Sequence, residues 1–410
     1  MEHIIQVEDF EPFIGSEVIA RIWAKARTLQ EIRVVNFNST YYGGGVAEML
    51  SPLTLLMNRL RIKTEWRVIQ GSPDFFGITK KMHNALQGGD INLTDLKLQI
   101  YESVVNENAV RNHLDHDYVV VHDPQPLPLI DHYPKKNPWV WRCHIDLSRP
   151  HPELWAYLVR FVEKYDAAIL SCREYAQRLS PPQLFFMPAI NPFSIKNRQL
   201  SDAEMDERLA HYHIPTDLPL IVQVSRFDPW KDPQGVIEAF KRARKEVDAT
   251  LVLLGNFATD DPEGAAIYEA LLGSREERIL VLPYGDDSAL VNTLQTRAAT
   301  VVQKSVREGF GLTVTEAMWK GTPVIGGNVG GIRYQIQDGV NGFLVSTIDE
   351  TAARMVQLVN NTELRARMGQ RARETVRQRF LLTRYLEQYL DLFSAFETTF
   401  RLRYHPGASL

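Results

Sequence analysis

Short apolar runs alternate with helical patterns along this chain, and this alternation constrains its fold more than any other feature of the sequence. Between most of the runs, apolar residues recur at intervals of three and four, as they do in residues 46–60. Repeated strand–helix alternation favours a parallel sheet that is covered by helices on both faces. In the first half of the chain the expected strands are residues 32–37, 64–69, 118–122, 139–145, 167–172 and 185–187.

The alternation weakens between residues 188 and 219, where prolines and polar residues surround one short helical stretch at residues 202–212. Prolines in such number interrupt regular structure, so this segment is the best candidate for a linker. Beyond it the alternation resumes, and a second sheet of the same kind is expected. Its strands are residues 221–224, 250–254, 279–282, 300–302, 323–325 and 342–345.

A chain of 410 residues is roughly two to three times as long as a typical domain, which agrees with two sheets. We expect an N-terminal Rossmann-like domain over residues 1–200 and a second one over residues 201–379. The chain is helical in pattern after residue 349, and the last helix, at about residues 380–410, must bury its apolar side. We expect it to pack back on the first domain. The predicted fold class is therefore α/β, with two doubly wound domains that face each other across a cleft.

Charge and composition exclude several classes of protein. Lys and Arg number 46 and Asp and Glu number 50, so the formal charge of −4 gives no electrostatic reason to expect nucleic acid or an anionic membrane as a partner. Two cysteines are too few for a disulfide scaffold or a structural zinc cluster. The N-terminus does not resemble a secretory signal, and no apolar run is long enough to span a membrane, so a cytoplasmic protein is expected.

The loops that follow strands are the candidate sites, because ligands of open parallel sheets bind at the carboxyl ends of the strands. The first such loop, residues 38–45, ends in Gly43, Gly44 and Gly45 just before a helix. Glycines let backbone amides approach an anion, and the helix adds the positive end of its dipole. A tight turn between strand and helix would explain one or two of these glycines, but less easily three.

Two cations follow a strand of the second domain. Arg226 and Lys231 are five residues apart and come just before a helix. Arginine can hold a phosphate with two hydrogen bonds and lysine supplies a compact charge, so the two residues suit a diphosphate leaving group. The alternative is an ion pair on the surface, in which Arg226 bridges Asp228.

The strongest motif lies within residues 307–318, where Glu308 and Glu316 are eight residues apart. Because the glycines between them disfavour one continuous helix, we expect Glu308 on a loop and Glu316 within a helix that begins near residue 312 or 313. The backbone amides of residues 309–312 would then face the cleft with a carboxylate on each side. Carboxylates accept hydrogen bonds from neighbouring hydroxyls, so this arrangement suits a sugar ring. In the alternative interpretation, Glu316 is a solvated helix residue.

His144 and Asp146 end the run of strand-like residues that begins at Trp139. A lone histidine is usually structural. At the carboxyl end of a strand, beside the expected cleft, a polar contact to the substrate becomes a comparably frequent role.

Three other features indicate a site less well. Asp115 and Asp117 resemble a metal-binding D-x-D motif, but they precede a strand, so we interpret them as a polar entry to that strand. His211 and His213 could form a metal pair but have no evident third ligand. Cys143 has no base or group of cations nearby in the sequence that would mark an activated thiolate.

Taken together, the three loops resemble those of the family-4 retaining glycosyltransferases, which have the two-domain GT-B fold. The spacing of Glu308 and Glu316 is the mark of this family. Residues 38–48, 122–126, 141–147 and 226–231 are similar to those of its trehalose-forming members, and the resemblance covers nearly the whole chain. It implies reversible transfer of glucose from a nucleoside diphosphate glucose (UDP-, ADP- or GDP-glucose) to free glucose, which forms α,α-trehalose.

The resemblance also implies roles for the candidate donor-binding residues. Arg226 and Lys231 would hold the diphosphate and stabilise its charge as the glycosidic bond breaks. Glu316 would bind the ribose hydroxyls, and His144 would contact the donor glucose near its 6-hydroxyl and its anomeric carbon. The hydroxyls of the donor glucose would be bound by Glu308, Gly309, Phe310, Gly311 and Leu312.

Further residues complete the implied site. The glycine loop of Gly43, Gly44 and Gly45 would lie against the phosphates and the reacting centre. Tyr284 would contact the nucleotide base. The acceptor glucose would be bound by Asp123, Gln125 and Asp146.

No carboxylate in these loops stands out as a nucleophile for double displacement. The acceptor is therefore expected to attack the face from which the diphosphate leaves, with a phosphate oxygen taking its proton. No tightly bound cofactor or metal is expected, although Mg²⁺ can accompany the donor, and the resemblance implies a homodimer. Two alternatives remain open. One is a trehalose phosphorylase, which uses phosphate in place of the nucleotide, and the other is a non-catalytic sensor of sugar nucleotides.

Overall fold

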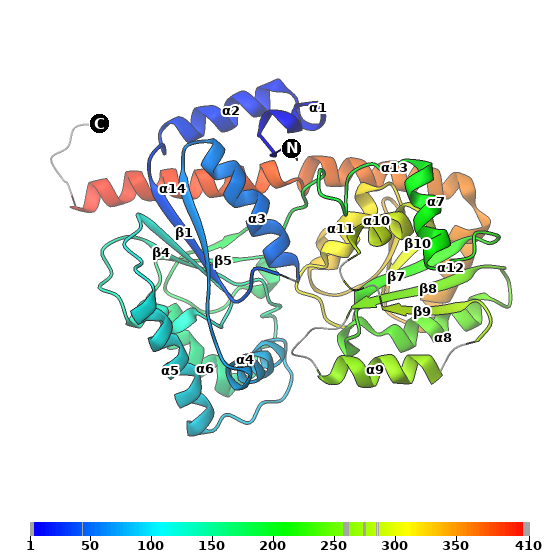
Figure 1. The fold of residues 1–410 in the computed structure, drawn as a ribbon, viewed down its shortest axis with the longest axis horizontal. Coiled ribbons are helices and arrows are strands. Elements are labelled where there is room, and N and C mark those ends of the chain that lie inside the picture. The colour runs from blue at the N-terminus through cyan, green and yellow to red at the C-terminus, as the bar shows by residue number, and fades with distance from the viewer. Residues whose placement is uncertain are drawn as a thin grey trace. The chain divides into compact units, whose positions relative to one another are not determined.

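The computed structural model of this chain describes residues 4–42, 44–256, 262–273, 276–283, 285 and 287–404. Its internal contacts divide the chain into two compact units. The first unit holds the residues up to Ala189 together with those from Leu382 onward, and the second unit spans Ile190–Leu381 (Figure 1). Each unit has a sheet and a hydrophobic core of its own.

The first unit is built on a parallel sheet with the strand order β2-β1-β3-β4-β5-β6. Every strand that the first half of the sequence predicts has a counterpart, although the strand predicted at residues 185–187 lies two residues earlier, at Gln183–Phe185. β4 ends at Arg142 rather than at residue 145, because the backbone turns away from the sheet after Cys143. The last hydrogen bond to the neighbouring strand is donated by Cys143 N to Ile169 O. The strands are β1 (Arg33–Asn38), β2 (Lys63–Val68), β3 (Tyr118–His122), β4 (Trp139–Arg142), β5 (Ala167–Leu170) and β6 (Gln183–Phe185).

One face of this sheet is covered by α2 (Ser16–Arg27), α3 (Gly44–Arg59) and α14 (Leu382–Tyr404), which share a single hydrophobic core with the strands. The apolar residues of α3 recur at intervals of three and four, so they form one stripe that faces the sheet. The other helical segments of the unit are η1 (Glu8–Phe10), α1 (Glu11–Ile14), α4 (Pro73–Leu86), α5 (Asp95–Arg111), η2 (Leu127–Asp131), α6 (Pro152–Val162) and η3 (Arg173–Tyr175).

The last helix, α14, belongs to the first unit although it follows the second unit in the sequence. Its residues Tyr385, Tyr389 and Phe393 are four apart and are buried in the first core. On the outer side, Lys25 of α2 lies 2.7 Å from Asp391. Figure 1 shows α14 running alongside α2. The prediction that the C-terminal helix packs back on the first domain is confirmed.

The second unit repeats the design with the strand order β12-β11-β10-β7-β8-β9, again with all strands parallel. Every strand predicted for this half is present, with small differences at the ends. The strands are β7 (Leu220–Arg226), β8 (Thr250–Asn256), β9 (Ile279–Pro283), β10 (Ala298–Gln303), β11 (Val324–Gly327) and β12 (Phe343–Val345). The helical segments are α7 (Asp202–His211), η4 (Pro229–Lys231), α8 (Pro233–Ala243), α9 (Pro262–Gly273), α10 (Ser288–Arg297), α11 (Leu312–Trp319), η5 (Gly330–Tyr334), α12 (Ile348–Asn360) and α13 (Thr362–Arg379). Within the described ranges, no helix is both long and apolar enough to cross a membrane.

The proline-rich segment, which was expected to be a linker, contains the boundary between the two units, at Ala189 and Ile190, and its residues after that boundary are packed against the second unit. Asn292 of α10 donates hydrogen bonds of 2.8 Å to the carbonyls of both Ile195 and Arg198. Trp319 of α11 donates through Nε1 to Asn197 O over 3.1 Å. A segment without regular structure cannot pair its own carbonyls, so side-chain donors from two helices satisfy them instead.

Candidate active site

The loops after β7 and β10 lie close together because these two parallel strands are neighbours in the second sheet. One loop leads from β7 through η4 into α8, and the other leads from β10 through residues 304–311 into α11. Val306 N donates to Trp230 O over 2.9 Å and ties the two loops together. The cations of the first loop and the carboxylates of the second therefore share one edge of the sheet.

Lys231 and Glu308 form a buried ion pair at this edge. Lys231 Nζ lies 2.5 Å from Glu308 Oε2, which also accepts a hydrogen bond of 3.1 Å from Ser305 Oγ. Only 17% of the Lys231 side chain and 9% of the Glu308 side chain are exposed. Gln223 Nε2 donates to Lys231 O over 2.9 Å and so fixes the backbone at this position. The structure thus brings together the expected diphosphate-binding cation and the expected sugar-binding carboxylate, and it adds Ser305, which the sequence did not single out.

Arg226 has a different partner. Its Nη2 donates to Asp228 Oδ2 over 2.9 Å, and Asp228 Oδ1 accepts a hydrogen bond of 2.9 Å from Trp230 N. This is the ion pair that the sequence left open as the alternative. The Arg226 side chain is nevertheless 42% exposed, and a guanidinium group has five N–H donors, so the contact to Asp228 leaves donors for a ligand.

The turn formed by residues 309–312 requires glycine at Gly311, and its packing requires a second glycine at Gly331 of η5. Gly311 has φ = 84°, which is left-handed, and it is the N-cap of α11. A Cβ on the neighbouring Gly331 would lie 2.4 Å from Phe310 Cα. Among the described residues, the N–H groups of Phe310, Gly311 and Leu312 find no acceptor. These amides lie at the positive end of α11 and can bind an anion or a hydroxyl oxygen.

Glu316 lies within α11, as predicted, but it is only 4% exposed, so the interpretation as a solvated helix residue is wrong. Lys196 Nζ lies 3.8 Å from Glu316 Oε1. Lys320 Nζ donates to Glu316 O over 3.2 Å and to Asn197 Oδ1 over 3.1 Å, and burial lowers the pKa of Lys320 to about 7. Lys196 is not among the predicted site residues, because it lies in the proline-rich segment that the sequence indicates as a linker.

In the first unit, the structure brings Asp123 and His144 together. Asp123 follows β3 with φ = 61°, and its Oδ1 accepts a hydrogen bond of 2.7 Å from His144 N. Trp141 Nε1 donates to Asp123 O over 3.1 Å and holds the backbone of this turn. Burial raises the pKa of Asp123 to about 6, and the bond from His144 N opposes part of that rise.

The imidazole of His144 contacts a second histidine, His122, which sequence analysis did not select as a site residue. The two rings are nearly parallel, with 13° between their planes, and His144 Nε2 lies 3.1 Å from His122 Nδ1. On its other side, His122 Nε2 lies 3.0 Å from Asn36 Oδ1. Burial and the nearby Arg142 lower the pKa of His122 to about 3 and the pKa of His144 well below its usual value. A strand-final histidine in an apolar run gives no local signal of such a contact.

The other expected site residues are more scattered. Asp146 is buried, and its Oδ1 accepts a hydrogen bond of 2.8 Å from Ser148 N. Gln125 has a buried Oε1 without a partner in the described part of the chain. Gly44 and Gly45 begin α3, and Gly44 has φ = 79°. Two expected site residues, Gly43 and Tyr284, lie outside the described residues.

Asp115 and Asp117, which the sequence argued against as a metal site, have a structural role. Asp117 Oδ2 accepts a hydrogen bond of 2.7 Å from Arg33 N, and Asp115 Oδ2 lies 3.2 Å from Arg33 Nη1, so both acids support the start of neighbouring strands. Cys143 is buried, and burial raises the pKa of its thiol well above the usual value. In the described ranges, no group of three or more His, Cys, Asp or Glu side chains is placed to hold a metal ion.

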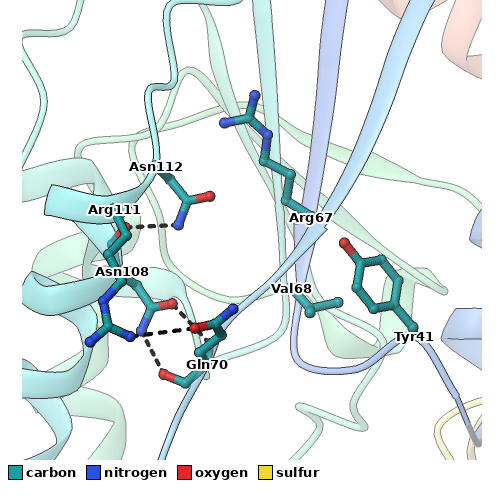
Figure 2. Close-up of a pocket in the computed structure, with 7 residues that line it drawn as sticks. All are labelled: Tyr41, Arg67, Val68, Gln70, Asn108, Arg111 and Asn112. Carbon is teal, nitrogen blue, oxygen red and sulfur yellow. Dashed lines mark hydrogen bonds between the residues drawn. The ribbon is translucent and has the colours of Figure 1, made fainter.

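A small pocket opens in the first unit where β2 ends. Its volume is about 200 Å³, and Figure 2 shows Tyr41 on one side of it and amide side chains on the other. Tyr41 comes from the glycine loop between β1 and α3, and its hydroxyl donates to Trp66 O over 3.0 Å. None of the expected site residues lines this pocket, which is formed by Tyr41, Arg67, Val68, Gln70, Asn108, Arg111 and Asn112.

Both halves of the chain match known protein families. A family model described as the N-terminal domain of trehalose synthase matches residues 36–177, and one described as glycosyl transferases group 1 matches residues 204–375. The trehalose synthase of Thermococcus litoralis is 42% identical over 400 residues, which cover 95% of this chain and 97% of that protein. A trehalose phosphorylase of Grifola frondosa is 28% identical, and the match covers 91% of this chain and 59% of that protein.

Among solved structures, HepE of Anabaena in complex with UDP and glucose has a TM-score of 0.66 to this chain at 18% identity. The match covers 89% of this chain and 100% of that one. The predicted GT-B fold is therefore confirmed. Identity of 42% extends over nearly all of both sequences and includes both units. The chain belongs to the trehalose synthase family of glycosyltransferases.

Proposed function

We propose that this protein transfers glucose from a nucleoside diphosphate glucose, such as UDP-glucose, to free glucose, forming α,α-trehalose, and that the reaction is reversible. The observation that carries the proposal is the Lys231–Glu308 ion pair beside the open amides of residues 310–312. A cation can bind a diphosphate, and a carboxylate next to backbone amides can bind the hydroxyls of a hexose. One edge of the sheet therefore holds groups that can bind the diphosphate and the sugar of a nucleotide sugar. Membership of the trehalose synthase family supports glucose as the acceptor.

Donor binding would change the partner of Lys231. In the free protein its ammonium group is neutralised by Glu308. A diphosphate carries more negative charge than one carboxylate, so it would draw Lys231 away and leave the oxygens of Glu308 to accept hydrogen bonds from glucose hydroxyls. Arg226, which is exposed beside Asp228, would supply a second contact to the diphosphate. Glu316 would accept hydrogen bonds from the ribose hydroxyls.

The two cations would stabilise the charge that develops as the bond between C1 of glucose and the phosphate oxygen breaks. The oxygen of the acceptor hydroxyl forms the new bond to C1 on the same face, and its proton passes to a phosphate oxygen of the leaving nucleoside diphosphate. Configuration at C1 is then retained without a covalent bond between sugar and protein. Holding the two sugars in this orientation removes much of the entropic barrier.

On the acceptor side, we propose Asp123, Gln125 and Asp146 as contacts of the acceptor glucose. With a pKa of about 6, Asp123 is mostly ionised at neutral pH and can accept a hydrogen bond from a sugar hydroxyl. Gln125 Oε1, which has no partner among the residues that the structure describes, is a second acceptor of the same kind. Gly43–Gly45 would lie against the phosphates, and Tyr284 would contact the nucleotide base.

The proposal includes no tightly bound cofactor, and Mg²⁺ would enter with the phosphates of the donor, which it prefers as ligands. We also propose that the protein acts in the cytoplasm as a homodimer, on small-molecule substrates and without nucleic acid or membrane as a partner.

A panel of substrates with product identification tests this function. Trehalose incubated with UDP or ADP should yield a nucleoside diphosphate glucose and free glucose, whereas trehalose incubated with phosphate should yield no glucose 1-phosphate. The similarity to the Grifola frondosa protein makes a phosphorylase the second candidate, and glucose 1-phosphate formed only in the phosphate reaction would establish it. Binding of UDP-glucose without turnover under any condition would favour a sensor.

A further inference from the structure

A chain of three buried or half-buried polar side chains crosses the first sheet, and the proposed reaction uses only its last member. Asn36 on β1, His122 on β3 and His144 after β4 are linked by contacts of 3.0 Å and 3.1 Å. Asn36 and His122 are each 1% exposed, so water does not compete for these contacts. Which ring nitrogens of the two histidines carry a proton therefore follows from the donors and acceptors of these three side chains.

The amide oxygen of Asn36 can only accept a hydrogen bond, so His122 must carry its proton on Nε2. A neutral imidazole carries one ring proton, which leaves His122 Nδ1 as an acceptor. His144 must then carry its proton on Nε2 and donate it to His122 Nδ1. His144 Nδ1 is left with a lone pair and no proton.

Both rings are neutral because of their surroundings. The guanidinium of Arg142 is fully buried nearby, and together with burial it lowers the pKa of each histidine. Among the described residues, a carboxylate that contacts His144 is that of Asp123, whose Oδ1 accepts a hydrogen bond from His144 N. Burial and the charge of Arg142 therefore oppose a second proton on either ring.

The lone pair of His144 Nδ1 is buried and has no hydrogen-bond donor in the described part of the chain. An acceptor removed from water without a partner costs free energy, and native structures seldom contain one without a function. His144 is only half buried as a residue and follows the carboxyl end of β4, where ligands of such sheets bind.

We propose that Asn36 and His122 are positioning residues that hold His144 in the neutral tautomer with its proton on Nε2, so that Nδ1 accepts a hydrogen bond from a hydroxyl of the bound sugar. The nature of that ligand rests on the proposed function, whereas the tautomer does not. In this state His144 Nδ1 offers a ligand a lone pair and no proton.

The tautomer can be measured without any substrate. The chain has 11 histidines, and ¹⁵N-histidine labelling with long-range ¹H–¹⁵N correlation distinguishes protonated from bare ring nitrogens. His144→Gln identifies the signals of His144. We expect His144 Nε2 to be protonated and Nδ1 bare, with no titration between pH 5 and pH 9. A proton on Nδ1, or a titration within that range, would overturn the inference whatever the activity of the protein.

Saturation with UDP-glucose in the absence of acceptor tests the contact to the sugar. The Nδ1 resonance of His144 should shift while Nε2 stays protonated, with saturation monitored by the increase in melting temperature. A saturated protein with an unchanged Nδ1 resonance would overturn the sugar contact. A protein that does not bind UDP-glucose at all would instead contradict the proposed function.

Two amide substitutions of His122 separate positioning from a general structural role. In His122→Asn the side-chain amide lies where Nδ1 was, so an acceptor for His144 is retained. In His122→Gln the amide extends toward Asn36 instead, and that acceptor is lost. We expect kcat/KM for UDP-glucose to fall about tenfold in His122→Gln and less than about threefold in His122→Asn, with the tautomer signal of His144 lost only in the former. Equal losses in both variants with an unchanged His144 spectrum would refute the positioning role, and the spectrum of the unsubstituted protein decides the tautomer if either variant fails to fold.

Discussion

Replacement of Lys231 by alanine tests the electrostatic basis of the proposed reaction. The ammonium group is preorganised, since only 17% of the side chain is exposed and both ends of the residue are held, by Glu308 and by Gln223. Removal of one preorganised contact to a developing charge typically costs about 10² to 10³ in kcat, or about 2.7–4 kcal/mol of transition-state stabilisation. We therefore expect kcat/KM of Lys231→Ala to fall by at least about a hundredfold.

The same substitution also removes the cation that faces the buried carboxylate of Glu308. Breaking a buried ion pair by removing one partner costs about 3–5 kcal/mol of stability. Because Ser305 still donates to Glu308, we expect a smaller loss, on the order of 1–3 kcal/mol. The variant Lys231→Ala, Glu308→Gln should regain much of this stability, since a neutral amide needs no counter-charge, but it should regain no activity because the diphosphate still lacks its cation.

Initial rates of trehalose formation from UDP-glucose and glucose measure the activity, and urea denaturation measures the stability. Lys241→Ala is the matched control, because Lys241 lies on α8 of the same unit and pairs with Glu276 at the surface, so its kcat/KM should stay within about twofold of the unsubstituted protein. Near-normal kcat/KM in Lys231→Ala would refute the assignment. Recovery of activity in the double variant would show instead that Lys231 acts only by neutralising Glu308.

Three further predictions test other parts of the structure. The pKa of Asp123, about 6, exceeds the roughly 3.9 of an unfolded chain, so this carboxyl binds more protons in the native state between about pH 4 and pH 6, and its contribution to the free energy of unfolding decreases as pH rises through that range. Chemical denaturation should therefore show the free energy of unfolding of the unsubstituted protein falling relative to that of Asp123→Asn as pH rises through that range. Gly331→Ala, whose Cβ would lie 2.4 Å from Phe310 Cα, should lose about 1–3 kcal/mol of stability and bind UDP-glucose less tightly. Gly77→Ala, in open surroundings on α4, should gain about 0.5–1 kcal/mol, and equal melting temperatures for the two glycine variants would contradict the steric argument. Lys196→Met should weaken UDP-glucose binding about three- to tenfold in calorimetry with kcat unchanged, because the Glu316 carboxylate loses a nearby cation, and an unaltered affinity would show that Lys196 has no part in the site.

Local patterns were sufficient to predict the strands of both sheets. A strand buried in a parallel sheet requires a continuous apolar run, and a covering helix requires an apolar stripe, so both are visible within a few residues of sequence. The same is true of the loop that carries Glu308, since Gly309 and Gly311 delay the start of α11 to Leu312. Resemblance to a family then supplied the chemistry that no local pattern contains.

The partners of the polar side chains depended on the tertiary structure. Lys231 and Glu308 are 77 residues apart and meet only because β7 and β10 are neighbours in the sheet. Lys196 reaches Glu316 because helix side chains hold a segment that has no regular structure of its own. His122 ends an apolar strand and gives no sign in the sequence of its contacts on β1 and after β4. Strand order decides such contacts, and strand order follows from how whole helices pack on the sheet rather than from any short stretch of residues.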